Sequence, residues 1–233
     1  MKRTVGFITA MALAIAWPVS SQANNVTGGV APEKEREIRR AIANLSIPFV
    51  KNEGQSDKRV KFYAKTFAGT AFVTEKGEIV YSLPEGDAKT AGREKTVGSE
   101  GTAASRSVAE HRHAIIKESL VGAKKIKHIK GEEKSSANIS SFIGNDKTKW
   151  RPRIPAYNVV NIGEVYQGIE FKLRAHGNNV EKFFYIAPHA NPLAIKLNLD
   201  GAKSLTVNER GELEAQTESG AVTFTKPIAY QEI

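Results

Sequence analysis

The first candidates for chemistry in this chain are two histidines that stand one residue apart. His111 and His113 would face the same side of a β-strand, and some metal sites are built from such a pair. They follow a long polar stretch, and no third ligand stands beside them in the sequence. The pair is therefore a candidate metal site with a simpler interpretation as two ordinary exposed histidines, and we predict no bound metal.

Three glutamates in the last third of the chain are the candidates for acid–base chemistry. Hydrolysis of a glycosidic bond needs two carboxyl groups at a defined separation. Glu170 alternates with Ile169 and Phe171 and should face water, while Glu164 and Glu181 lie close to turns. Nothing in the sequence brings two of these acids together, so we predict no catalytic residue. No phosphate-binding loop or dinucleotide motif occurs either, so we predict no cofactor.

Aromatic and cationic side chains around residue 150 are the better candidates for binding. Trp150 stands between Lys149 and Arg151, outside any regular strand pattern, and Arg153 and Tyr157 follow closely. An exposed group of this kind contacts sugar rings or protein partners. A tryptophan that anchors a loop on the core is the more ordinary interpretation. We therefore take Trp150, Arg151, Arg153 and Tyr157 as candidate binding residues and keep both interpretations.

The whole chain is basic, with a formal net charge of +9 at pH 7. A basic exported protein meets anionic polysaccharides, lipid surfaces or nucleic acid. Acids are mixed with bases along most of the chain, and the local excess of lysine lies at residues 124–130. That run is predicted to be a strand whose charged edge prevents edge-to-edge pairing, with an anion-binding patch as the alternative. We expect glycans or other surface-protein modules as partners, and no nucleic acid.

The first 23 residues have the composition of a secretory signal peptide. Two basic residues precede an apolar stretch at residues 5–19, and Ser21 and Ala23 place small side chains at the −3 and −1 positions of a cleavage site. A membrane-spanning helix needs about 20 apolar residues, and this stretch is shorter and has Pro18 near its end. We predict a cleaved leader, export to the periplasm, cell surface or exterior, and no later transmembrane segment.

The sequence contains no cysteine. An exported chain without disulfides must be held together by an apolar core. About 210 residues remain after the leader, which is enough for one large β-domain or two small ones. The absence of thiols also excludes thiolate catalysis, cysteine-ligated zinc and iron–sulfur clusters.

The elements that must position these residues are nearly all β-strands. In the last third of the chain, residues 168–175, 180–186, 194–199 and 221–225 alternate between apolar and polar side chains and are separated by turn residues. A period of two buries one face of each strand. We predict an all-β fold, a mostly antiparallel β-sandwich that forms one domain over residues 46–233.

Two segments depart from the strand pattern. Residues 24–45 are predicted to be a flexible N-terminus followed by one amphipathic helix, which begins at Pro32 and carries Ile38 and Ile42 on an apolar stripe. That stripe should pack on the β-core, with a partner-binding role as the alternative. Residues 84–110 are rich in small and charged side chains, so we predict a long mobile insertion there.

Several short blocks, in a fixed order, resemble one bacterial domain family. They read Pro-Phe-Val-Lys-Asn-Glu-Gly-Gln from residue 48, Phe-Ile-Gly-Asn-Asp from residue 142, Gly-Glu-Val-Tyr-Gln-Gly-Ile from residue 163, Val-Glu-Lys-Phe-Phe-Tyr from residue 180 and Phe-Thr-Lys-Pro-Ile-Ala-Tyr-Gln-Glu from residue 224. Over residues 45–233 the chain resembles the N-terminal domain of unknown function of bacterial secreted SBBP-repeat proteins. It departs from that family at Gln167, where proline is usual, and in an enlarged polar stretch.

The resemblance implies a β-propeller of SBBP repeats after the domain, so we expect this chain to be a truncated product, a fragment or a stand-alone version. It supplies no catalytic residue, because the family domain has no known function. We therefore predict a non-catalytic module of a secreted or cell-envelope protein with a structural or interaction role. The alternative is a carbohydrate-binding module or a glycan-active hydrolase, which would use Trp150 and nearby cations, or Glu170 and Glu181.

Overall fold

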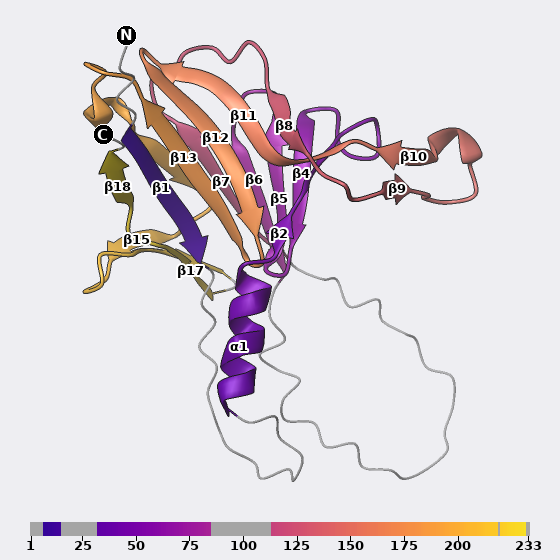
Figure 1. Ribbon diagram of the computed structural model, residues 1–233, viewed down its shortest axis with the longest axis horizontal. Helices are drawn as coiled ribbons and strands as arrows, with labels where there is room; N and C mark the ends of the chain where they lie inside the picture. The colour runs from indigo at the N-terminus through magenta and orange to yellow at the C-terminus, as the bar shows by residue number, and fades with distance from the viewer. Residues whose placement is uncertain (1–6, 15–31, 85–112, 219, 232–233) are drawn as a thin grey trace.

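A computed structural model of the chain describes residues 7–14, 32–84, 113–218 and 220–231. Within these ranges the chain is all-β and mostly antiparallel, as the alternation predicts (Figure 1). Apart from Pro84, the expected mobile insertion at residues 84–110 lies outside the described residues, and so do His111 and residues 24–31.

The elements of the first half are mainly short strands that follow one another closely. They are β1 (Phe7–Ala14), α1 (Pro32–Ala43), β2 (Ser46–Ile47), β3 (Phe49–Lys51), β4 (Val60–Thr66), β5 (Gly69–Thr74), β6 (Ile79–Pro84), β7 (His113–Leu120), β8 (Lys130–Lys134) and β9 (Ile139–Ser141). β4, β5 and β6 form the expected meander, with each strand antiparallel to the next.

The second half contains the longest strands. Its elements are η1 (Lys147–Lys149), β10 (Arg151–Ile154), β11 (Ala156–Tyr166), β12 (Ile169–His176), β13 (Asn179–Ile186), η2 (Pro192–Ala194), β14 (Leu197–Asp200), β15 (Ser204–Val207), β16 (Leu213–Thr217), β17 (Gly220–Phe224) and β18 (Ile228–Gln231). Tight turns separate β11 from β12 and β12 from β13, so these three strands run as an antiparallel meander, while a single residue separates β10 from β11.

Most strands belong to one continuous curled sheet. Its order is β14-β7-β6-β5-β4-β3-β11-β12-β13-β1-β17-β16-β15, while β18 pairs with β1, β2 with β12 and β8 with β11. Figure 1 shows β4 to β7 behind β11 to β13, with the sheet bent between the two groups. The two layers of the expected sandwich are therefore parts of the same sheet.

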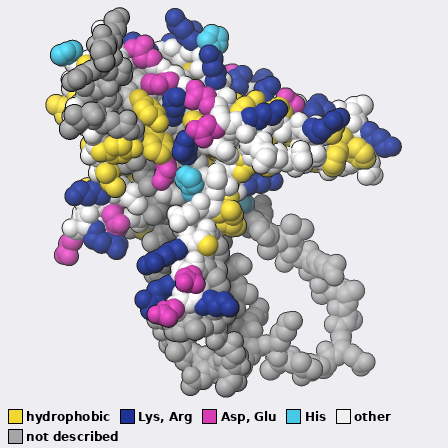
Figure 2. Space-filling view, viewed as in Figure 1, with side chains coloured by type: hydrophobic (Ala, Val, Ile, Leu, Met, Phe, Trp, Pro, Cys, Tyr) yellow, Lys and Arg dark blue, Asp and Glu magenta, His cyan; other side chains and the backbone are white. Residues whose placement is uncertain are grey.

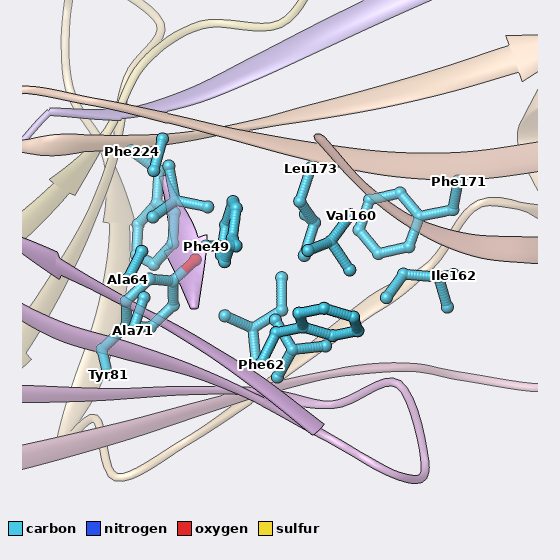
Figure 3. Packing of buried hydrophobic residues seen from close by; sticks show 14 of the residues in the cluster. Phe49, Phe62, Ala64, Ala71, Tyr81, Val160, Ile162, Phe171, Leu173 and Phe224 are labelled. Atoms are coloured by element: carbon cyan, nitrogen blue, oxygen red, sulfur yellow. The ribbon is translucent and has the colours of Figure 1, made fainter. Parts of the chain in front are cut away.

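The core lies between these layers and follows from the strict alternation of β12 and β13. Every second side chain is buried along both strands. Phe171 and Phe184 stack in register, with ring centroids 4.6 Å apart, and Figure 3 shows Phe171 beside Val160, Ile162 and Leu173. Each such buried side chain contributes about 1.5–3 kcal/mol to the free energy of folding, which is how a cysteine-free chain holds together.

A helix, α1, begins at Pro32 as predicted, but the side chains of Ile38 and Ile42 lie outside the described part of the structure, so their packing on the core stays a prediction. Figure 1 shows α1 extending beyond the end of the sheet. Ala41 of α1 is exposed, and seven of the 12 residues of this helix are charged. No helix within the described ranges is long and apolar enough to cross a membrane.

The strand expected within residues 124–130 is wrong, because residues 124–129 form no regular element and β8 begins only at Lys130. Ile126 and Ile129 both pack against the core. They stand three residues apart, whereas an extended strand would place them on opposite faces. The backbone bends so that both side chains reach the core, and Lys127 and His128 between them are left on the surface.

Candidate functional site

A two-stranded arm carries three of the four candidate binding residues. β9 and β10 form a separate antiparallel sheet, and Figure 1 shows this pair projecting from the body of the molecule. Trp150 directly precedes β10, and Arg151 and Arg153 lie within it. Pro152 fits there because a strand at an edge tolerates a missing N–H. We refer to residues 139–154 as the arm.

The side chain of Trp150 is half-buried and organises the tip of the arm. Its indole Nε1 donates a hydrogen bond to the carbonyl of Gly144 at 3.1 Å. Phe142 meets the indole edge-on, with ring centroids 5.3 Å apart, and Lys147 Nζ lies 5.8 Å from the indole centroid. Trp150 therefore anchors the loop of the arm itself, whereas the ordinary sequence-based interpretation placed it on the core.

Two large apolar side chains at the tip were missed by the sequence reasoning. The exposed fractions of Phe142 and Ile143 are 60% and 64%. Both stand in the turn between β9 and η1, and Figure 2 shows hydrophobic and basic side chains together on the projecting part of the surface. Two adjacent apolar residues before Gly144 were the available signal, because a tight surface turn usually carries polar side chains.

Arg151 and Arg153 have different roles within the arm. Arg151 Nε donates to the carbonyl of Glu53 at 2.9 Å, and its Nη1 donates to the carbonyl of Trp150 at 3.0 Å. The bond to Glu53 ties the arm to the loop after β3, and the bond to Trp150 lies within the arm. Arg153 is exposed and has a positive φ of 55°, and its backbone N–H donates a hydrogen bond to Ser140 Oγ at 3.2 Å. Arg153 is thus the free cation of the candidate set within the described arm.

Tyr157 does not join the other three candidates. It lies on β11 in the body, where its ring meets Phe62 edge-on at a centroid distance of 6.0 Å. Gly131 on β8 lies against the same ring, and a Cβ added there would stand 2.3 Å from it. Tyr157 therefore packs strands together, and the remaining three candidates share the arm.

The histidine pair is only half described. His113 begins β7, and its Nδ1 lies 3.4 Å from Ser82 Oγ. His111 lies outside the described residues. Within the part of the chain that the structure describes, no three acids or histidines gather where they could hold a metal ion.

The three candidate acids are each engaged by a neighbouring side chain. Glu164 pairs with Lys124 at 2.8 Å, and hydrogen bonding from this lysine lowers the pKa of the Glu164 carboxyl. Glu170, directly opposite Glu164 in the β11–β12 register, accepts a bond from Asn161 Nδ2 at 2.7 Å. Glu181, on β13, has a carboxylate oxygen 3.4 Å from Nε2 of His176. These contacts hold all three carboxylates on the sheet surface.

A second polar cluster links β8 to the outer face of β11 and β12. Lys172 Nζ lies 2.8 Å from Glu132, and Asn161 donates to the same carboxylate at 2.7 Å. Partial burial opposes the charged form of Glu132, but these hydrogen bonds outweigh it and lower the pKa of its carboxyl. The cluster fixes β8 on the sheet.

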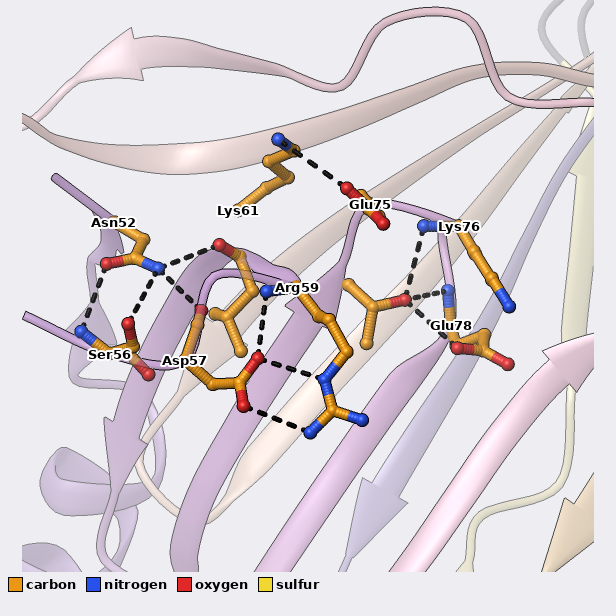
Figure 4. A network of polar contacts seen from close by, with 10 residues as sticks. Asn52, Ser56, Asp57, Arg59, Lys61, Glu75, Lys76 and Glu78 are labelled. Carbon is orange, nitrogen blue, oxygen red and sulfur yellow. Dashed lines mark hydrogen bonds and ion pairs between the residues drawn. The ribbon is translucent and has the colours of Figure 1, made fainter. Parts of the chain in front are cut away.

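A basic groove of about 710 Å³ runs beside the segment at residues 124–130. Glutamates are outnumbered by lysines among its lining residues, which include Lys61, Glu75, Lys76, Glu78, Lys124, Lys125 and Lys127. Lys61 pairs with Glu75 at 3.9 Å, as Figure 4 shows. No described acid forms an ion pair with Lys76, Lys125 or Lys127, so this groove keeps uncompensated positive charge.

Next to the groove, the loop between β3 and β4 is held by its own polar residues (Figure 4). Asn52 Nδ2 donates to the carbonyls of Asp57 and Val60, at 2.8 and 2.9 Å. Arg59 reaches the Asp57 carboxylate with two bonds of 2.9 and 3.0 Å. These bonds lower the pKa of Asp57 from 3.8 to about 2, so the carboxylate stays ionised across the physiological range.

An ion pair lies in the middle of the core, where sequence reasoning did not look. Lys182 Nζ on β13 is 3.0 Å from Glu118 on β7, and neither side chain is more than 1% exposed. Tyr81 donates to the other oxygen of Glu118 at 2.7 Å. Lys182 Nζ also lies 5.0 Å from the ring centroid of Phe224. Burial, together with the neighbouring Glu118 charge, raises the pKa of Tyr81 well above 10.0.

The comparisons with known proteins give one match. A family model described as "Domain of unknown function (DUF7948)" covers residues 49–233. No curated protein and no solved structure matches the chain. The matched region contains the arm, the basic groove and the buried ion pair, while β1 and α1 lie before it.

Proposed function

The chain belongs to the DUF7948 family, and from this premise we propose that it is a non-catalytic interaction module of an exported bacterial protein. The engaged state of its three candidate acids supports a scaffold rather than a reactive site. The composition of the first 23 residues supports export. The short blocks that resemble SBBP-repeat proteins support a place beside a β-propeller, and a propeller encoded in frame directly downstream in the gene would test that association.

The observation that carries the proposal is the exposed tip of the arm. Phe142 and Ile143 stand more than half exposed on a projecting hairpin, and the cation of Arg153 lies on the same arm. Aromatic and arginine side chains supply most of the binding free energy in protein interfaces. An apolar pair at the end of a projection lies open to a partner, which supports the arm as the contact surface.

Photo-crosslinking of the full chain tests this proposal. A photoreactive amino acid at Phe142 should give specific adducts with envelope proteins in the producing bacterium. The matched control is the same amino acid at Leu193, which is 81% exposed but lies on η2. Adducts confined to position 142 support the arm as the contact surface. Equal adducts from both positions, or none from position 142, contradict it.

Glycan binding is the second candidate, because Trp150 lies on the same arm beside Phe142. The contact of Lys147 with the indole and the bond from Nε1 to Gly144 make this less favourable for sugar stacking. A glycan array with the full chain and with Trp150→Ala separates the two functions. Binding that the substitution abolishes would favour the carbohydrate role, and turnover of a polysaccharide abolished by Glu181→Gln would show an enzyme instead.

A further inference from the structure

One strand alone joins two parts of the curled sheet. β1 pairs on one side with β13, through residues Phe7 to Ala12, and on the other side with β18 and β17. Figure 1 shows β1, in dark indigo, between β13 and β18. In the described part of the chain, β18 has no other strand partner. The ladder between β13 and the C-terminal strands therefore runs entirely through β1.

The same eight residues lie inside the leader that the proposed function removes. Cleavage after Ala23 would take β1 away and leave six residues of β13 and four of β18 without their ladder partners. Unpaired N–H and C=O groups along two facing strand edges form a template for another strand. The exported chain would then contain a gap one strand wide.

Side-chain contacts in the core also join β13 to β17. Lys182 of β13 reaches Phe224 of β17 at 5.0 Å in the core, and both side chains are fully buried. Lys182 is also paired with Glu118 of β7 at 3.0 Å. These contacts join β13 to β17 and to β7 through the core, which supports a gap that stays open when the leader is gone.

We propose that this gap is an acceptor slot for a β-strand supplied by a partner polypeptide, which runs antiparallel to both β13 and β18. The inference rests on the proposed function, since it requires export and removal of the leader. The partner strand should be uncharged and mostly apolar, because the segment that lies in this position, β1, has the sequence Phe-Ile-Thr-Ala-Met-Ala-Leu-Ala and no charged residue. Backbone hydrogen bonds on both sides of an added strand supply the affinity in this mode of recognition.

A pair of introduced thiols measures whether the slot is open. Phe183 and Ile228 are both in register with Ala10, and the chain has no cysteine of its own. In the exported full-chain variant Phe183→Cys/Ile228→Cys, two strand spacings separate the two positions by roughly 9–10 Å. A disulfide needs Cα atoms within about 7 Å. We expect both thiols to remain reduced and open to alkylation.

A synthetic peptide then supplies the strand. It carries the sequence of residues 7–14 with cysteine in place of Ala10 and lysines at both ends for solubility. We expect disulfide capture of one peptide per protein, detected as added mass. The matched peptide with proline in place of Thr9 and Met11 cannot donate the ladder bonds and should be captured at least about tenfold less efficiently. The variant Leu193→Cys, remote from the slot, should not distinguish the two peptides.

The possible results distinguish a failure of the slot from a failure of the proposed function on which the slot rests. Intact mass shows whether the exported product begins after Ala23. A product that keeps residues 1–23 overturns both the leader and the slot.

If the leader is removed, a disulfide between the two introduced thiols shows that β18 has closed on β13, and equal capture of both peptides shows non-specific adhesion. A dimer whose β13 amides are protected from hydrogen exchange shows that a second copy fills the gap. Each of these three results overturns the slot and leaves the proposed function standing.

Discussion

At the residue scale, the most informative side chain is Lys182, a lysine that is 0% exposed in an apolar core. The alternation of β13 explains its direction, because residues 180, 182, 184 and 186 all face inward. The sequence alone left this open, since Phe183 and Phe184 are adjacent and only one can face the core. Glu118, the partner of Lys182, is 64 positions away in the chain, and no local sequence pattern predicts such a contact.

Breaking this ion pair should strongly destabilise the protein. Lys182→Met leaves Glu118 buried without a counter-charge and should lower the free energy of unfolding by about 3–5 kcal/mol. The double variant Lys182→Met/Glu118→Gln removes both charges and should recover part of the loss. Urea unfolding followed by circular dichroism measures both. A loss below about 1 kcal/mol for the single variant would show that Glu118 is solvated or already neutral.

The carboxyl of Asp57 should titrate far below its usual range. Bonds from the Arg59 side chain and from the Arg59 backbone N–H lower its pKa to about 2, and Arg59→Ala, which removes the side-chain bonds alone, should return the value part of the way toward 3.8. Because the native pKa is lowered, the stabilising effect of this pair is present above the ordinary pKa and is lost as the pH falls toward 2. An NMR titration of the side-chain carboxyl measures this, and an unchanged pKa in the variant would contradict the assignment.

At the scale of elements, the arm is a separate two-stranded unit that is held in place by its own side-chain contacts. β9 and β10 pair only with each other within the described sheets, and Trp150 and Arg151 secure the tip and the base. The sequence placed Trp150 outside any regular strand pattern, and Trp150 directly precedes β10, which includes Pro152. It did not indicate a projection, because the bonds from Arg151 to Glu53 span 98 positions.

Trp150→Ala should loosen the arm without unfolding the body. The substitution removes the bond to Gly144 and the contact with Phe142, so amides of β9 and β10 should lose protection from hydrogen exchange. The free energy of global unfolding should change by less than about 1 kcal/mol, because local openings are independent of the core. Tyr157→Ala, which removes a contact in the body, is the contrasting control and should lower global stability by about 3 kcal/mol or more.

At the scale of the whole molecule, the alternating strands were enough to predict the all-β class. They did not predict that one sheet curls to form both layers, because strand order depends on long-range pairing such as β14 with β7. The lysine-rich run was assigned to a strand because charge pattern was given more weight than the three-residue spacing of Ile126 and Ile129. The role of β1 could not be foreseen, since an apolar leader and an apolar strand have the same composition.

The basic groove should attract polyanionic surfaces. Each lysine near an anionic lipid surface contributes about 1 kcal/mol, so Lys125→Glu/Lys127→Glu should weaken binding to vesicles with anionic lipids by at least about thirtyfold. Lys34→Glu/Lys226→Glu changes the net charge equally at exposed sites elsewhere and is the matched control. Co-sedimentation at low and high salt measures the difference. Equal weakening by both pairs would show that only net charge matters.

The path of strands ends at β14 on one side and β15 on the other, and each is only 4 residues long. Margins this short give a neighbouring copy few backbone bonds to join. Further copies of the protein should therefore add poorly to β14 or β15 by edge-to-edge strand pairing. Association through strand edges should instead be directed to the slot between β13 and β18, where longer runs of backbone groups are open.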